Sequence, residues 1–183
     1  VAIERFKKIS GNGAKCTIVC VYGNRAYEDT LVQMEDVAKE CGFDVIAAVA
    51  AVAEHSIMHQ YAAGRPDADD EKQLETFAEQ ISVKEGTVTS VPGNRPYKKG
   101  GGAGLVPKVT ADCVKCGLCA ESCPVKAIDQ HSFKADSKSC ISCMRCVSQC
   151  PHNARKVSGV MVGIVGLALK KACSLRKENE LYL

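Results

Sequence analysis

The chain has 183 residues, 46% of them hydrophobic, and a formal net charge of +3, which is a normal balance for a globular protein. Its length suits one medium domain or two small ones. Basic residues are spread along the sequence and only 5% of residues are aromatic, so the composition argues against nucleic-acid binding. The unusual feature is cysteine, with 12 residues, eight of them between Cys113 and Cys150.

Cysteine at this density indicates either a disulfide framework or bound metal, and the redox compartment decides between them. The first residues show no basic segment, apolar run or cleavage site of a secretory signal. We therefore expect a reducing, cytoplasmic setting. The sequence starts at Val1 in what resembles the end of an amphipathic helix, and we interpret it as a fragment cut inside a domain.

The first 90 residues alternate between strand and helix patterns, as in an α/β domain. Residues 16–22 form an apolar run, predicted to be a strand covered on both faces, and a helical pattern follows from residue 31 to Gly42. Residues 43–53 predict a second buried strand, and residues 67–81 a second amphipathic helix. The short connections predict parallel pairing of the two strands. Two strands would leave unpaired edges, so a complete domain needs more.

The segments after residue 90 differ in composition. Residues 91–108 hold three prolines and five glycines and indicate a linker. Its glycine run is not interpreted as a phosphate loop, because no strand precedes it and no helix follows. Residues 158–183 predict a C-terminal helix and tail. Their apolar stretch is shorter than the roughly 20 residues that span a bilayer, so we expect a helix packed on its own protein without membrane contact.

A true repeat lies between the linker and the C-terminal helix. CVKCGLCAESCP from Cys113 and CISCMRCVSQCP from Cys140 both have the spacing C-x2-C-x2-C-x3-C-P, which is the bacterial iron–sulfur ligand run. In two-cluster proteins the fourth cysteine of each run binds the other cluster. This predicts two 4Fe-4S clusters, one on Cys113, Cys116, Cys119 and Cys150 and the other on Cys140, Cys143, Cys146 and Cys123.

Other metal and cysteine interpretations fit less well. Structural zinc would need two cysteine pairs separated by a longer loop, and disulfides suit neither the compartment nor the regular spacing. We expect Cys16, Cys20, Cys41 and Cys173 to be small buried hydrophobic residues. His55 and His59 have no third ligand nearby, which favours surface or packing roles, and Arg65 is expected to anchor its loop.

Residues 109–157, with both motifs unbroken, resemble a bacterial-type two-cluster ferredoxin, which implies a small α+β domain with pseudo-twofold symmetry. The strand, GN-x-x-Y turn and helix of residues 17–41 are similar to the flavodoxin loop that lies against the flavin ring. The whole chain thus resembles bacterial fusions of a flavodoxin-like domain to such a ferredoxin. The resemblance implies that residues 1–90 are the C-terminal part of a flavodoxin-like domain with a parallel sheet, truncated at its N-terminus.

The same resemblance makes Asn24 and Tyr27 neighbours of an FMN ring. The alternative is a turn asparagine and a partly buried tyrosine at a helix start. The loop that holds the FMN phosphate in flavodoxins would lie before Val1, so FMN binding is expected only with that N-terminal part present.

These features favour an electron-transfer protein that exchanges electrons with redox partner proteins. No arrangement of residues for acid–base or nucleophilic catalysis is evident, so we assign no catalytic residue. The alternative function is an FMN-dependent reductase whose clusters feed its flavin. A structural or interaction module that binds zinc is a third interpretation.

Overall fold

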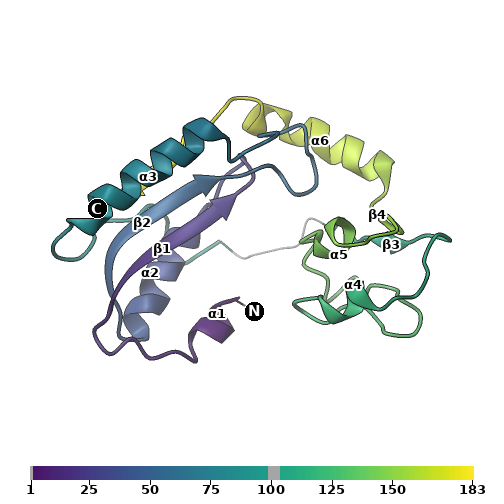
Figure 1. Cartoon of the computed structure of the whole chain (residues 1–183), viewed down its shortest axis with the longest axis horizontal. Helices are drawn as coiled ribbons and strands as arrows, with labels where there is room; N and C mark the ends of the chain where they lie inside the picture. Colours follow the sequence, from purple (N-terminus) through teal and green to yellow (C-terminus); the bar gives the residue numbers. More distant parts are fainter. Residues whose placement is uncertain (1, 99–103) are drawn as a thin grey trace. The chain divides into compact units, whose positions relative to one another are not determined.

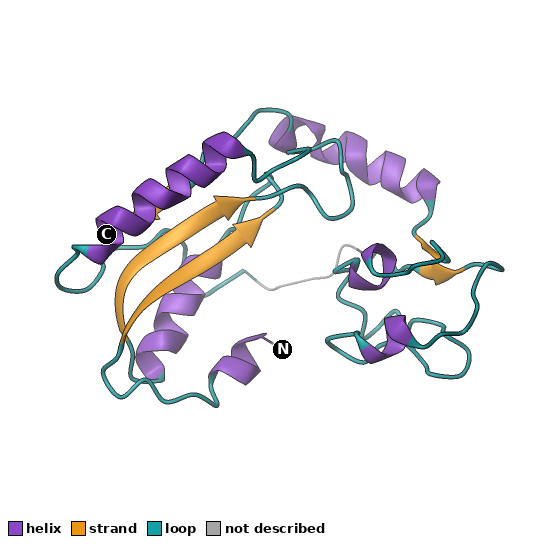
Figure 2. Cartoon of the chain, viewed as in Figure 1, coloured by secondary structure: helices purple, strands orange, loops and turns teal. Residues whose placement is uncertain are grey.

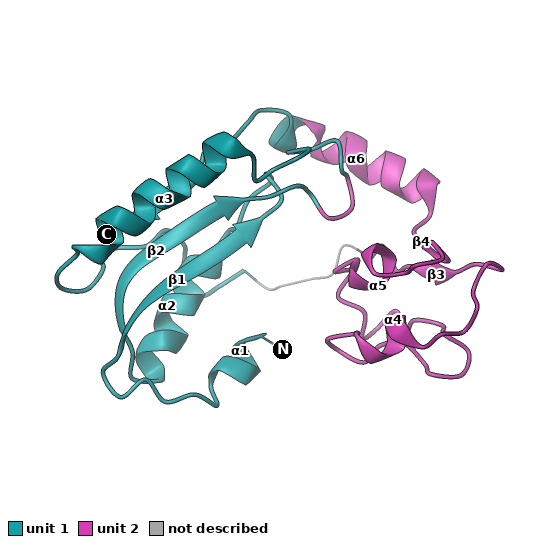
Figure 3. Cartoon of the chain, in the orientation of Figure 1, with its two compact units in different colours: residues 1–55, 59–99, 171–183 teal, residues 56–58, 100–170 magenta. Residues whose placement is uncertain are grey.

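The computed structural model describes residues 2–98 and 104–183 (Figure 1). The chain divides into two compact units (Figure 3), with residues 1–55, 59–99 and 171–183 in the first and residues 56–58 and 100–170 in the second. The helices and strands are, in order, α1 (Ala2–Phe6), β1 (Lys15–Tyr22), α2 (Thr30–Glu40), β2 (Asp44–Val52), α3 (Ala68–Ser82), β3 (Lys108–Val109), α4 (Leu118–Glu121), α5 (Arg145–Ser148), β4 (Arg155–Lys156), α6 (Gly159–Cys173) and β5 (Glu180–Tyr182).

A parallel pair of strands forms the centre of the first unit (Figure 2). Helix α2 packs on both β1 and β2, and α3 packs on β2. Every residue from Ala47 to Val52 is buried, as expected for a strand covered on both faces. The predicted order of strands and helices and the parallel pairing are therefore confirmed, whereas the flavodoxin-like identity of this unit stays a prediction.

Strand β1 differs from the prediction because one of its faces is open. Ile18 and Cys20 point into the core, whereas Val19 and Val21 are 48% and 65% exposed. Successive side chains of a strand point to opposite faces, so the alternation means that the described part of the chain covers only one face of β1. An unbroken apolar run predicts burial on both faces, but burial also requires a helix or strand that packs on each face.

The third strand of the sheet comes from the C-terminal tail, which the sequence analysis did not predict to be a strand. β5 pairs antiparallel with β2, with Leu181 opposite Val49, and gives the strand order β1-β2-β5. Residues 171–183 accordingly belong to the first unit, whereas we expected them in a separate C-terminal region. The three-residue strand is too short to show an alternating pattern in the sequence.

A buried hydrogen-bond network connects the tail to the start of α3. Asp67 caps α3, and its backbone N–H donates to Asp70 Oδ2 at 2.9 Å. Arg65 Nε donates to Asp70 Oδ2 at 2.8 Å, and Asn179 Nδ2 donates to Asp70 Oδ1 at 3.0 Å. The hydrogen bond from Arg65 is the main reason why the pKa of Asp70 lies far below its usual range. Arg65 thus anchors its loop, as predicted, and also holds the tail by donating to the Lys177 carbonyl.

Part of the predicted linker is folded on the first unit. Val91 lies in the core, and two carboxylates at α2 hold the residues that follow it. Asn94 N donates to Asp29 at 2.8 Å, and Arg95 Nε donates to Asp36 at 2.8 Å. The Pro and Gly content of residues 91–98 therefore marks a fixed loop rather than a connection between units. Residues 99–103 of the predicted linker, with most of its glycine run, lie outside the described residues.

Helix α6 is apolar, yet four of its large hydrophobic side chains are exposed, with exposed fractions of 46–75%: Val160, Met161, Ile164 and Leu167. They recur at helical spacing and form one apolar face of the helix, and the expected packing of the helix on its own protein stays a prediction. Among residues 2–98 and 104–183, no helix is long and apolar enough to cross a membrane.

The Asp70 network predicts a large stability difference between neighbouring substitutions. Asp70 is 1% exposed, and Asp70→Ala leaves Arg65 as a buried charge without its carboxylate, which costs about 3–5 kcal/mol. Asp69→Ala changes an exposed residue of the same helical turn and costs less than about 1 kcal/mol. Urea unfolding followed by tyrosine fluorescence measures this difference in the first unit, which holds all five tyrosines of a chain without tryptophan: Tyr22, Tyr27, Tyr61, Tyr97 and Tyr182.

The pH dependence of the same transition provides an independent check. The native pKa of Asp70 is lowered, so its contribution to stability is complete above the unfolded pKa of about 3.9 and is lost as the pH falls toward the native value. The unfolding free energy of the wild-type protein therefore falls more steeply below about pH 4 than that of Asp70→Ala. Parallel pH curves for the two proteins would contradict the assignment.

Candidate metal centre

The two cysteine motifs fold into equivalent loops of the second unit. In each, a residue with a left-handed backbone precedes a single helical turn, Gly117 before α4 and Met144 before α5. The third cysteine of each motif, Cys119 or Cys146, lies in that turn, and the fourth follows it. The sequence repeat is therefore also a structural repeat.

The two loops share an alternating pattern of left-handed backbone residues. Positive φ angles occur at Lys115 and Gly117 in the first loop, at 58° and 85°, and at the equivalent Ser142 and Met144 in the second, at 53° and 59°. Left-handed residues at every second position are typical of backbone nests, whose N–H groups bind anions, including iron–sulfur clusters. Three of these four residues carry a side chain, at a conformational cost of about 1–2 kcal/mol each. Such strain is typical of a ligand site.

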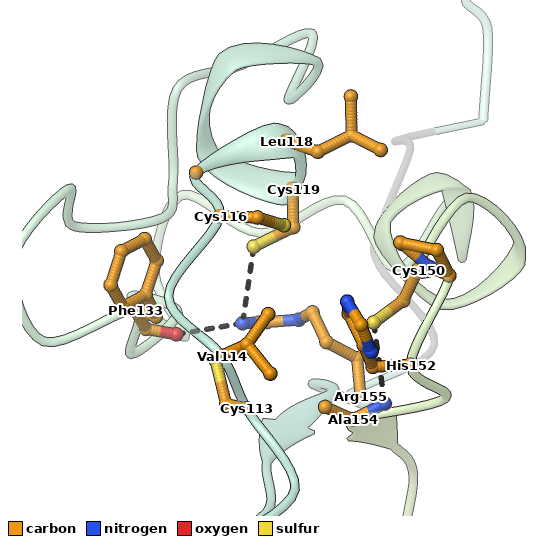
Figure 4. A pocket seen from close by; sticks show the side chains of 12 residues that line it. Cys113, Val114, Cys116, Leu118, Cys119, Phe133, Cys150, His152, Ala154 and Arg155 are labelled. Carbon is orange, nitrogen blue, oxygen red and sulfur yellow. Dashed lines mark hydrogen bonds between the residues drawn. The ribbon is translucent and has the colours of Figure 1, made fainter.

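The first pocket gathers cysteines from both motifs (Figure 4). Cys113, Cys116 and Cys119 of the first loop and Cys150 of the second motif line this pocket. The rest of the lining includes Phe133 and the backbone around Gly117. Four sulfur donors around one pocket suit a group that takes four thiolate ligands.

The second pocket repeats this arrangement. Cys140, Cys143 and Cys146 line it together with Cys123 of the first motif. The structure thus brings together each of the two predicted sets of four cysteines. In the described residues no three His, Cys, Asp or Glu side chains converge on one metal-ion position. In a cubane each thiolate binds a different iron, so the cysteines of such a site surround the pocket instead of meeting at one point.

Backbone N–H groups already point at two of the eight sulfurs. Ala127 N lies 3.3 Å from Cys123 Sγ, and Ala154 N lies 3.2 Å from Cys150 Sγ. In both places the residue before the alanine has a positive φ, which turns the N–H toward the sulfur. Such hydrogen bonds stabilise a thiolate ligand and influence a cluster's reduction potential.

Arg155 belongs to the first pocket, although the sequence analysis did not single it out. Its Nη1 lies 2.7 Å from the Phe133 carbonyl and 3.9 Å from Cys119 Sγ (Figure 4). Burial raises the pKa of the Cys146 thiol, and the nearby Arg155 guanidinium opposes that rise. Alignment of the two repeats could have pointed to Arg155, because this charged residue stands where the first copy has the apolar Ile128.

The two residues assigned to a flavin ring contact the chain's own C-terminal segment. Asn24 is 2% exposed, and its Nδ2 donates to the carbonyls of Cys173 and Leu175, both at 2.8 Å. The Tyr27 hydroxyl donates to Glu180 and lies 2.8 Å from the Tyr182 hydroxyl. Their polar atoms are therefore occupied in this structure by residues 173–182.

The remaining cysteines and histidines lie elsewhere. Cys20 and Cys173 are buried and Cys16 and Cys41 are half-buried, and none of these four described residues lines either cysteine pocket. All 12 cysteines are described, and no disulfide joins them. His59 Nδ1 lies 2.5 Å from Glu54 Oε1 on the surface, and burial lowers the pKa of His55.

Comparison with known proteins agrees with this geometry. Residues 112–154 match the family described as the 4Fe-4S dicluster domain, and the match includes both cysteine motifs. No curated protein matches the chain. The match supports a bacterial-type ferredoxin domain at residues 112–154 and, with it, iron–sulfur electron transfer.

Proposed function

We propose that the chain carries single electrons to and from redox partner proteins through two 4Fe-4S clusters. The observation that carries this proposal is the pair of pockets, each lined by three cysteines of one motif and the fourth cysteine of the other. When bound, clusters of this type accept and release one electron at low potential. The dicluster family match of residues 112–154 supports the same function.

The proposed ligands are the two sets that line the pockets. The first cluster is held by Cys113, Cys116, Cys119 and Cys150, and the second by Cys140, Cys143, Cys146 and Cys123. The loop N–H groups stabilise the negative charge of the thiolates and sulfides. This division of ligands interlocks the two halves of the repeat, because neither pocket is complete without the other motif.

The same loops offer a route for electrons to the surface. Cys116 and Cys143 are exposed, whereas the other six motif cysteines are partly covered. Beside them, Val114 and Ile141 are 58% and 49% exposed. We propose that redox partners approach these loops, since a short distance between the surface and a ligand sulfur favours electron transfer.

Metal content tests the proposal directly. Anaerobic reconstitution is expected to give about eight irons and eight sulfides per chain, as two cubanes require. A variant with Cys16→Ala, Cys41→Ala and Cys173→Ala is the control, and it should keep the full iron content because these residues line neither pocket. A colourless protein with one or two zinc ions would instead indicate the zinc-binding module.

Double substitutions test which cysteines share a cluster. Cys113→Ala with Cys150→Ala removes two ligands of the same proposed cluster, so this variant should retain the second cluster and resemble Cys113→Ala alone in iron content. Cys140→Ala with Cys150→Ala removes one ligand from each cluster, so it should lose more iron than either single variant. Iron analysis and EPR spectroscopy of the reduced proteins measure the difference.

The reciprocal pairs provide the matched control. Cys140→Ala with Cys123→Ala should retain the first cluster, whereas Cys113→Ala with Cys123→Ala should damage both. If each cluster instead used the four cysteines of a single motif, the order of iron contents would be reversed in both comparisons.

A coupling to flavin is the second part of the proposal. It rests on the resemblance of residues 17–41 to a flavodoxin loop and on the parallel strands β1 and β2, whose carboxyl ends are where such sheets bind ligands. The edge-to-face contact of Tyr22 and Tyr27, with ring centroids 5.1 Å apart, supplies aromatic surface at that edge. Substrate turnover by a longer, flavin-loaded protein would favour the reductase over the carrier.

FMN titration checks the flavin proposal. The 183-residue chain should bind FMN only weakly, as measured by quenching of FMN fluorescence, because its sequence predicts no loop that would hold the FMN phosphate. A longer form of the protein, if it supplies a phosphate-binding loop, should bind FMN and lose affinity when Asn24 and Tyr27 are both changed to alanine. Asn94→Ala is the control for an asparagine outside this edge. A longer protein that does not bind FMN would refute the coupling.

A further inference from the structure

Arg155 is a buried arginine of the second unit. It starts β4, where Val109 of β3 is its partner, and only 2% of its surface is exposed. Lys156, the next residue of the strand, is exposed, as the alternation of a strand requires. Two neighbouring cations of one strand therefore lie in opposite environments, one in the interior and one in water.

The Arg155 guanidinium has neutral partners in the protein. Nη1 donates to the Phe133 carbonyl at 2.7 Å, and Nη2 donates to the Pro107 carbonyl at 3.1 Å. Among residues 2–98 and 104–183, no carboxylate forms an ion pair with Arg155, and its buried Nε has no hydrogen-bond partner. A buried charge without a counter-charge is costly, so a site of this kind is typical of a bound anion.

Arg155 contacts a cysteine of the first proposed set. Its Nη1 lies 3.9 Å from Cys119 Sγ, and Arg155 lines the first pocket together with that cysteine. The position equivalent to Arg155 in the first copy is Ile128, so only the second copy has a cation at this position of the repeat.

We propose that Arg155 is a positioning and tuning residue that raises the reduction potential of the first cluster, an inference that rests on the proposed function. Each cluster with its thiolates is an anion, and reduction adds one more negative charge. A nearby buried cation stabilises the reduced form more than the oxidised form, because charges interact strongly away from water. An arginine keeps its charge across the physiological pH range, so the effect does not depend on protonation.

The test is a redox titration of reconstituted protein, followed by EPR spectroscopy. Arg155→Gln keeps polar contacts but removes the charge, and it should lower the one-electron reduction equilibrium constant at least tenfold, or about 59 mV. Arg155→Lys keeps the charge and should restore most of the midpoint potential. Lys156→Gln is the matched control, because it removes the same charge from the exposed neighbour and should cause a much smaller shift that disappears at high salt.

The outcomes separate this inference from the proposed function. Wild-type protein without iron would refute the proposed function before any potential is measured. Full iron content in Arg155→Gln with an unchanged midpoint potential would refute only the role of Arg155. If Arg155→Gln assembles poorly, the Arg155→Lys variant decides the question. A midpoint potential near that of the wild-type protein supports the role of the charge. A tenfold lower reduction equilibrium constant in Arg155→Lys overturns it.

Discussion

The buried carboxylate of Asp70 is the constraint on which the architecture of the chain depends. A charge this deep is stable only with several donors, and they come from three separate places, the turn at Arg65, the N-terminus of α3 and the tail residue Asn179. Because β5 follows Asn179 directly, the same interaction fixes the third strand of the sheet. The first unit therefore includes residues 171–183, and most of the second unit lies between two segments of the first in the sequence.

The predictable part of the fold is the part with long periodic patterns. β1 and β2 are apolar runs and α2 and α3 show an apolar helical period, so their type and order follow from the sequence. The role of the tail does not, because β5 has three residues and its attachment depends on side chains such as Asn24, more than 100 positions away. Residues 91–98 were predicted to be part of a linker for a similar reason. Their folded conformation depends on the carboxylates of two residues distant in the sequence, Asp29 and Asp36.

The candidate site was more accessible to sequence reasoning, because a cubane imposes its own spacing on the ligands. The two sets of four cysteines lie around two pockets, and the backbone nests explain why the loops tolerate Ser142 and Met144 in left-handed conformations. The role of Arg155 was not predicted, because it depends on the burial of the side chain, and the sequence around a single arginine does not indicate whether that arginine is buried. The flavin assignment of Asn24 and Tyr27 is the converse case, in which a short motif carried no information about the tail that contacts both residues.

The position of β5 after both cysteine motifs has a consequence for biosynthesis. Ribosomes make proteins from the N-terminus, and domains fold as they emerge. All eight motif cysteines lie before residue 151, whereas the last strand of the first unit occupies residues 180–182. The dicluster loops are therefore available to iron donors while the first unit still lacks part of its sheet, and in this chain the second unit is synthesised in full before the first unit is.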